Sequence, residues 1–389
     1  IDFFKGDSYM KRIRLGMVGG GEGAFIGEVH RMASRLDDRY TLCAGALCSD
    51  AKKAARSALS IGISQERSYS TYQEMASTES DLIDGIEVVA IVTPNHLHYP
   101  IAKEFMLAGI HVICDKPMTI GAQEARELID LAKTSNLMLA VTYNYSAYPM
   151  IRHARAMVQS GELGKLRVVQ TKYTQDWLTE PLENTNHKQA HWRVDPKKSG
   201  VGGCVGDIGT HAYHLSCFVT QLKATSLCAD LSSFVDGRRL DDNAHIMIRY
   251  EGNTKGMIWS SQVAPGNGNN LEIQIYGDKG GLVWRQEQPN ELIFTPINKS
   301  SQTLLRGSAG LSENANALSR VPVGHPEGYI EGFANLYREI ADALMIYRSG
   351  KKPSPGDILF PTGEDGYDGV SFVEAAVQSN NEGSVWISL

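Results

Sequence analysis

The sequence predicts an α/β protein in which a Rossmann-type, doubly wound parallel sheet is followed by an α+β domain with a large, mostly antiparallel open sheet. Two observations predict this fold class. In the first third of the chain, short apolar runs alternate with amphipathic stretches, which is typical of parallel strands covered by helices on both faces. Beyond about residue 150, runs of alternating apolar and polar residues are separated by turn residues, which indicates hairpins.

Each strand expected in the first third is a near-continuous apolar run. These predicted strands are Ile13–Gly20, Tyr40–Cys48, Glu87–Thr93, Ile110–Cys114 and Leu137–Tyr143. The helices expected between them run from the Gly-rich turn to Leu36, onward from Asp50, and over Leu97–Ala108 and Ala122–Lys133. Ligands of a doubly wound sheet bind beyond the carboxyl ends of its strands. We therefore expect a dinucleotide-binding Rossmann domain over residues 10–147.

The second predicted domain, residues 148–389, combines hairpins with a few helices and is expected to hold substrate. Its predicted strands are Leu166–Tyr173, Ala244–Tyr250, Gly256–Val263, Leu271–Tyr276 and Leu282–Arg285. Its predicted helices are Ile151–Val158, Asp207–Val219, Ile330–Tyr347 and Gly366–Ser379. The polar stretch Asn298–Val321 is expected to be a mobile loop.

Composition narrows the functional classes. A net charge of −6 and a pI near 6.0 argue against a nucleic-acid partner, which favours a basic face. No apolar run approaches the ~20 residues that span a bilayer, so no membrane partner is expected. The six cysteines are widely spaced, which predicts reduced thiols in a cytoplasmic protein. The stretch Ile1–Tyr9 is expected to be a leader without functional weight.

A Gly-rich turn follows the first predicted strand. Gly19, Gly21 and Glu22 lie where a backbone approaches a pyrophosphate and where the next helix offers free N–H groups. The strict G-x-G-x-x-G spacing is broken, because Ala24 occupies the last position. The alternative is an ordinary Gly-rich turn, but its place in a βαβ run favours dinucleotide binding.

The end of the second strand bears on the choice between NAD and NADP. A carboxylate usually binds the adenosine ribose at this point. Here Cys48 and Ser49 stand there, and Ser49 with Lys52 or Lys53 offers a site for a 2′-phosphate. The neighbouring Asp50 is expected to cap the next helix. NAD and NADP both stay open.

Polar residues also follow the next two strands. Thr93 and Pro94 end one strand and place Asn95 and His98 at the expected cofactor edge. His96 and His98 alone are a weak metal signal, and polar contacts of the loop are favoured.

Lys116 follows the fourth strand. A lysine beside a bound nicotinamide can hydrogen-bond a substrate hydroxyl and stabilise the alkoxide as hydride leaves. Pro117 restricts the backbone before it. The alternative is a surface lysine.

The segment Gly202–His214 carries the strongest local signal. On a helix, Asp207, His211 and His214 share one face, and an aspartate that orients an imidazole is general-base geometry. The alternatives are a capping aspartate and core histidines. A zinc site from Cys204 and these histidines matches no usual spacing, so no metal is expected.

Aromatic and polar residues elsewhere suit the apolar face and hydroxyl rim of a sugar, although a packed loop has the same composition. The expected substrate wall comprises Tyr143, Asn144, Tyr145, Asp176, His191, Trp192, Arg193 and His214.

Together these motifs resemble the glucose–fructose oxidoreductase and inositol dehydrogenase family, Gfo/Idh/MocA, over nearly the whole chain. The matching elements, in the family's order, are the Gly-rich turn, Thr93–His98, Asp115–Pro117, Trp192–Pro196, Gly202–His211 and Pro361–Ser379. The last three are the most specific.

The resemblance implies an NAD- or NADP-dependent oxidoreductase that acts on a secondary alcohol of a sugar, glycoside or cyclitol. It implies that Lys116 is the catalytic lysine and that Asp207 and His211 form an acid–histidine pair. It also implies a homodimer or homotetramer built through the C-terminal sheet. Two alternatives stay open, namely an NAD-dependent glycosidase that oxidises transiently and a non-catalytic sugar or dinucleotide sensor.

The sequence departs from the family pattern at three places. Asp115 replaces the usual Glu before the lysine, and His214 stands where many members carry Asp. An insertion around Ala24–Ile26 changes the expected phosphate contacts.

Overall fold

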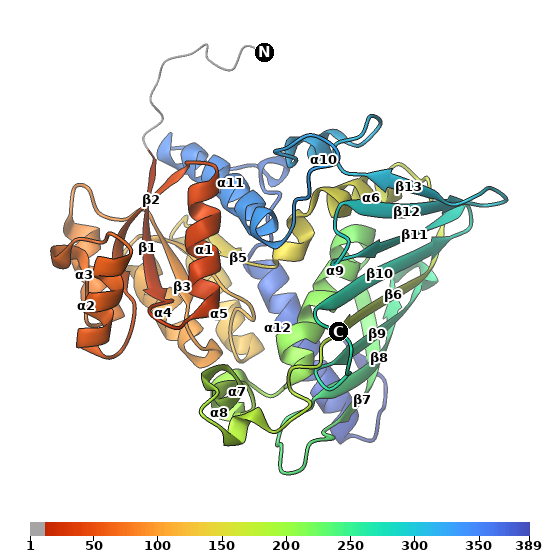
Figure 1. The fold of residues 1–389 in the computed structure, drawn as a ribbon, viewed down its shortest axis with the longest axis horizontal. Helices are drawn as coiled ribbons and strands as arrows, with labels where there is room; N and C mark the ends of the chain where they lie inside the picture. Colours follow the sequence, from red (N-terminus) through yellow and green to blue (C-terminus); the bar gives the residue numbers. More distant parts are fainter. Residues whose placement is uncertain (1–11) are drawn as a thin grey trace.

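The protein, represented by a computed structural model that describes residues 12–389, has two sheets separated by a layer of helices (Figure 1). The stretch expected to be a leader lies outside these described residues, as do the first two residues of the predicted Rossmann domain. The part of the chain that is described contains no helix long and apolar enough to cross a membrane.

The N-terminal sheet is parallel throughout and has the strand order β2-β1-β3-β4-β5. Its strands are β1 (Ile13–Gly19), β2 (Tyr40–Ala46), β3 (Val88–Val92), β4 (His111–Cys114) and β5 (Leu139–Val141). Every residue of β3 is buried, as expected for a central strand covered on both faces. The helices of this part are α1 (Phe25–Leu36), α2 (Ala51–Ser60), α3 (Tyr72–Asp81), α4 (His98–Leu107) and α5 (Ala122–Thr134). The predicted Rossmann architecture is confirmed.

The C-terminal sheet has the order β13-β12-β11-β10-β6-β9-β8-β7-β14. Its strands are β6 (Leu166–Thr174), β7 (Ala224–Ser232), β8 (Asn243–Tyr250), β9 (Lys255–Ser261), β10 (Asn270–Gly277), β11 (Gly280–Arg285), β12 (Glu291–Pro296), β13 (Gln302–Leu305) and β14 (Ile387–Ser388). All its described pairings are antiparallel except that of β6 with β9. In β8, buried and exposed residues alternate, because helices cover only one face. The predicted mostly antiparallel sheet is confirmed.

Helices lie between the two sheets and cover the inner face of the C-terminal one (Figure 1). They include α6 (Pro149–Gln159), α9 (Thr210–Thr220) and α12 (Gly363–Asn381). Two short helices, α7 (Lys188–Arg193) and α8 (Pro196–Ser199), lie at one end of the interface between the two parts.

One late helix crosses back to the first sheet. Helix α11 (Tyr329–Arg348) packs along α1 and shares a core with β1 and β3. Tyr337, on α11, donates or accepts a hydrogen bond at His30 of α1, with 2.8 Å between its hydroxyl and Nδ1. The predicted division of the chain at residue 147 stays a prediction, since the N-terminal core also contains this C-terminal helix.

The segment Asn298–Val321 differs from its prediction as a mobile loop. It contains β13 and a short helix, α10 (Glu313–Ala317). Arg306, 2% exposed, fixes it by donating to Asn290 at 2.7 Å and to the carbonyl of Val321 at 2.8 Å. The sequence prediction was wrong here because the segment is held by a buried arginine, and hydrogen bonds of this kind leave no apolar periodicity in the sequence.

Candidate active site

A large cavity of about 1100 Å³ runs from the Gly-rich turn to the inner face of the C-terminal sheet. Its first half is lined by residues that follow β1, β2 and β3, at the carboxyl ends of the parallel strands. Its second half is lined by residues from β4 onward, including Lys116, Asp207 and His211. The cavity therefore lies where a doubly wound sheet binds a dinucleotide.

The Gly-rich turn has the shape that a pyrophosphate needs. Gly19 and Gly20 have φ values of +83° and +73°, which side chains rarely adopt. A Cβ on Gly21 would lie 2.8 Å from the carbonyl oxygen of Leu47. No side chain among the described residues caps α1, so the N–H groups of its first turn are available to an anion. The turn therefore fits a dinucleotide despite its irregular spacing.

The end of β2 carries no carboxylate toward the cavity. Cys48, Ser49 and Lys53 line it, whereas Asp50 caps α2 by accepting from the backbone N–H of Lys53 at 2.8 Å. The capping interpretation of Asp50 is thus confirmed.

The loop after β3 presents Thr93, Pro94 and Asn95 to the cavity. The Thr93 hydroxyl is buried and has no partner in the described part of the chain. His98 differs from its predicted cofactor contact, because it does not line the cavity. Its ring nitrogens instead contact the carbonyls of Pro117 and Thr93 at 2.8 Å each, and so tie together the loops after β3 and β4.

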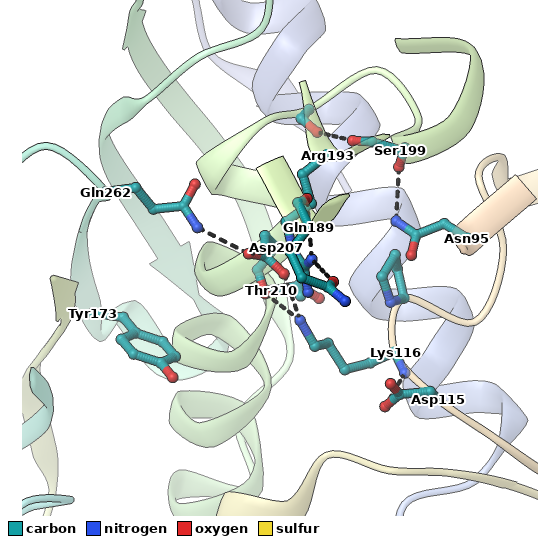
Figure 2. Close-up of polar contacts among 12 residues, drawn as sticks. Asn95, Asp115, Lys116, Tyr173, Gln189, Arg193, Ser199, Asp207, Thr210 and Gln262 are labelled. Atoms are coloured by element: carbon teal, nitrogen blue, oxygen red, sulfur yellow. Dashed lines mark hydrogen bonds and ion pairs between the residues drawn. The ribbon is translucent and has the colours of Figure 1, made fainter. Parts of the chain in front are cut away.

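Lys116 and Asp207 both line the cavity, and their side chains contact each other (Figure 2). Nζ of Lys116 donates to Oδ1 of Asp207 at 3.0 Å and to the Asp207 carbonyl at 2.5 Å. Asp207 lies in a π-turn, Val205–Gly209, that leads into α9. The predicted helix from Asp207 thus begins with a wider turn, a form that is frequent at functional sites.

Two further side chains hold the other oxygen of Asp207. Nε of Arg193, on α7, donates to Oδ2 at 3.2 Å, and Nε2 of Gln262, just after β9, donates to it at 2.8 Å (Figure 2). Burial raises the pKa of Asp207, but the charges of Lys116 and Arg193 outweigh burial and hold that pKa below the usual aspartate value. Asp207 is therefore a fixed carboxylate at neutral pH.

His211 lies in the same cavity among tyrosine rings. Its ring centroid is 5.6 Å from that of Tyr143, 4.9 Å from that of Tyr145 and 6.0 Å from that of Tyr173. Burial, together with the nearby Lys116 charge, lowers the pKa of His211 well below the usual value. Its imidazole is therefore neutral at pH 7 and able to accept a proton.

The predicted orientation of His211 by a hydrogen bond from Asp207 is corrected. Both carboxylate oxygens of Asp207 are engaged by Lys116, Arg193 and Gln262, and none of the described contacts joins them to His211. In a π-turn the backbone hydrogen bonds join residues i and i+5 rather than i and i+4. The α-helical spacing that placed Asp207 and His211 on one face in the prediction therefore does not apply.

The predicted substrate wall is only partly brought together. Asn144, Tyr145, Trp192 and Arg193 line the cavity. The remaining residues assigned to that wall lie outside the lining, namely Tyr143, Asp176, His191 and His214.

Each of these four has another environment. Tyr143 packs behind the wall, where its hydroxyl is 2.8 Å from Thr210 Oγ1 and its ring stacks on His214 at 4.3 Å. Nε2 of His214 lies 3.5 Å from Asp365. The carboxylate of Asp176 accepts from the backbone of Gly266 at 3.2 Å, and His191 is exposed on α7.

Sequence reasoning missed several residues that line the cavity. It also missed Gln262, which with Arg193 holds Oδ2 of Asp207 and is called the clamp residue below. The missed lining residues are Tyr173, Gln175, Trp177, Gln189, Asn269, Gln286, Tyr329 and Phe333. Four of them, Tyr173, Gln175, Asn269 and Gln286, lie at the ends of C-terminal strands, where a polar residue next to an apolar run is the available signal.

The described residues contain no cluster of three or more His, Cys, Asp or Glu side chains that could hold a metal ion. Cys204, considered above as a zinc ligand, instead donates its thiol to Asp241 at 3.1 Å.

The fold and the site define a nucleotide-dependent oxidoreductase, and comparison with known proteins gives the family. Residues 13–143 match the model described as an oxidoreductase family with an NAD-binding Rossmann fold, and residues 151–283 match the GFO/IDH/MocA C-terminal domain. The chain therefore belongs to the Gfo/Idh/MocA oxidoreductases, with NAD as the cofactor type of its Rossmann domain.

Relatives match over almost their whole length. The uncharacterized oxidoreductase YfiI of Bacillus subtilis is 36% identical over 97% of both chains. The crystal structure of an oxidoreductase from Sinorhizobium meliloti has 50% identity and a TM-score of 0.88, covering 97% of this chain and 99% of that one. An inositol dehydrogenase homolog from Azotobacter vinelandii, complexed with NADH and myo-inositol, has 34% identity and a TM-score of 0.92 over 98% of both chains.

Proposed function

We propose that this enzyme oxidises a secondary alcohol of a sugar, glycoside or cyclitol, with NAD or NADP as the hydride acceptor. The observation that carries this proposal is the convergence of Lys116, Asp207 and His211 in the cavity that begins at the Gly-rich turn. The myo-inositol bound by the Azotobacter vinelandii relative supports a polyol as the substrate class.

The coenzyme would be held by the Gly-rich turn, by Cys48 and Ser49 at the end of β2, and by Thr93–Asn95 after β3, all of which line the cavity. When bound there, it supplies the acceptor for the hydride that leaves the carbinol carbon. Lys116, which follows the next strand, lines the same cavity and would face the substrate beside the bound coenzyme.

The side chains of this protein manage the charge and the proton of the alcohol. The ammonium of Lys116 donates a hydrogen bond to the substrate oxygen, which stabilises negative charge as the alcohol becomes a carbonyl. A nitrogen of neutral His211 takes the hydroxyl proton. Asp207 does not take a proton, because it stays ionised and keeps the Lys116 ammonium in place.

The test is the Lys116→Ala variant, with Lys103→Ala on the exposed surface of α4 as the matched control. Removing a donor to a developing oxyanion lowers kcat by roughly 100- to 1000-fold. Coenzyme affinity, measured by calorimetry, should stay nearly unchanged. A Lys116→Ala variant that turns over at the wild-type rate removes this mechanism.

We also infer that the outer face of the C-terminal sheet joins subunits in a homodimer or homotetramer. Met247, Met257 and Tyr276 on that face are 51%, 46% and 41% exposed. Large apolar side chains gathered on an open sheet face are typical of an association surface.

A further inference from the structure

The cations in the substrate half of the cavity are already paired. We define this half by its lining residues from Asp115 to Phe333, where the carboxylates are Asp115 and Asp207, the Lys and Arg side chains are Lys116 and Arg193, and the imidazoles are His187 and His211. Two positive and two negative side chains leave no net charge. Both cations bond to Asp207, and Nη1 of Arg193 also donates to Gln189 at 2.5 Å.

Two tryptophan rings lie beside the Arg193 guanidinium as well. Its guanidinium lies 4.4 Å from the centroid of the Trp192 ring and 5.9 Å from that of Trp177. A guanidinium fixed by stacking and by a carboxylate is not a ready binding site for a further anion.

One part of this half is a closed ring of neutral groups that hydrogen-bond to each other. The Tyr145 hydroxyl donates to that of Tyr173 at 2.6 Å, and Tyr173 donates to Oδ1 of Asn269 at 2.7 Å. Nδ2 of Asn269 returns to the Tyr145 hydroxyl at 3.2 Å, and Gln175 adds a donor to Asn269 at 2.8 Å. Because burial raises the pKa of both tyrosines, the phenols stay uncharged.

The side-chain amide nitrogen of Asn144, in the same half of the cavity, has no hydrogen-bond partner in the described part of the chain and indicates that the ligand supplies an acceptor. Nδ2 of Asn144 is buried and has no hydrogen-bond partner among the described residues, and Asn144 lines the cavity with 2% of its surface exposed. A buried donor without a partner is rare in proteins. A neutral hydroxyl oxygen of a ligand satisfies such an amide without bringing a charge.

We propose that the substrate half selects an uncharged polyol and rejects the same polyol when it carries a phosphate or a carboxylate group. This inference rests on the proposed function and specifies its substrate. An anion placed here would lose its hydration without gaining an unpaired cation, so we expect the phosphorylated form to have a kcat/KM roughly 100-fold or more below that of the neutral form.

Matched pairs of ligands test the selection. The probes are myo-inositol and D-glucose, their monophosphates, and D-gluconate. Turnover with NAD⁺ and with NADP⁺ is followed by absorbance of the reduced coenzyme, and binding to the enzyme–NADH complex is measured by calorimetry. The inference expects the neutral member of each pair to bind and to react in preference.

The outcomes separate the two proposals. Equal or tighter binding of a phosphorylated or carboxylate probe overturns the selection and leaves the oxidoreductase proposal standing. Preferred binding of neutral polyols without oxidation by either coenzyme overturns the proposed function and leaves the selection standing. Failure of both neutral probes to bind overturns the selection as well.

A designed charge gives an independent test. Gln286 lines the substrate half, and Gln286→Lys adds an unpaired cation there, whereas Gln286→Met has a similar size and no charge. The lysine variant should lower the preference for the neutral probe at least tenfold, which corresponds to about 1.4 kcal/mol, while the methionine variant should keep the wild-type preference. An unchanged preference in a folded Gln286→Lys protein contradicts the inference.

Discussion

Replacing Gln262 by leucine isolates the role of the clamp on Asp207. Gln262 is 2% exposed and does not line the cavity, so the substitution removes no direct contact with coenzyme or substrate. It removes the 2.8 Å hydrogen bond to Oδ2 of Asp207 and a 3.5 Å contact with Oε1 of Gln175, and it leaves the 3.2 Å contact from Arg193. Asp207 then gains freedom to rotate away from Lys116.

The expected loss follows from the strength of that bond. A hydrogen bond to a charged group contributes about 1.5–3 kcal/mol, and 1.4 kcal/mol is about tenfold in rate. We therefore expect kcat to fall by about 10- to 100-fold. The KM for substrate and the coenzyme Kd should change little, because the clamp acts through Asp207 rather than on the ligands.

The assay is steady-state oxidation of a polyol substrate, with the melting temperature of each variant as a check on folding. Gln123→Leu, on the exposed face of α5, is the matched control for loss of a glutamine elsewhere. The reasoning is refuted by a folded Gln262→Leu enzyme with wild-type kcat, or by one whose only defect is a raised KM.

Three more results are expected. Because the pKa of His211 is lowered, its active neutral form persists at pH 6.5 and is lost only as the pH falls through that lowered pKa. In a plot of kcat/KM against pH, the acid limb should therefore have its midpoint below 6.5. A midpoint at or above 6.5 contradicts this expectation. Gly21→Ala places a Cβ 2.8 Å from the carbonyl oxygen of Leu47, which forces the Gly-rich turn to shift. The coenzyme Kd measured by calorimetry should therefore rise roughly tenfold. An unchanged Kd counts against the proposed pyrophosphate site at this turn. Replacing Met247 and Met257 together by lysine should dissociate the oligomer in light scattering after gel filtration, whereas an intact assembly places the interface elsewhere.

The fold was predictable because burial follows local patterns. The all-apolar run of β3 and the alternation in β8 are visible in short windows, and each pattern belongs to one kind of sheet. Lys116 and Asp207 were also found, although 91 residues separate them, because each follows a distinctive motif.

Other features depend on long-range pairing and had no local signal. Gln262, just after β9, reaches Asp207 because the π-turn packs against β9, and Asn269 joins Tyr173 because β10 pairs with β6. The π-turn at Asp207 lies among glycines that fit an ordinary helix start equally well, so the hydrogen bond expected between Asp207 and His211 was wrong.

The position of α11 affects how the protein folds as it leaves the ribosome. The first sheet is complete in sequence at Val141, yet apolar residues of α11 that seal one of its faces begin only beyond Tyr329. At about 5–20 residues per second, synthesis of the intervening chain takes about 10–40 seconds. During this interval the nascent Rossmann domain exposes the apolar surface that α11 later covers. Truncated N-terminal fragments should therefore aggregate or recruit chaperones.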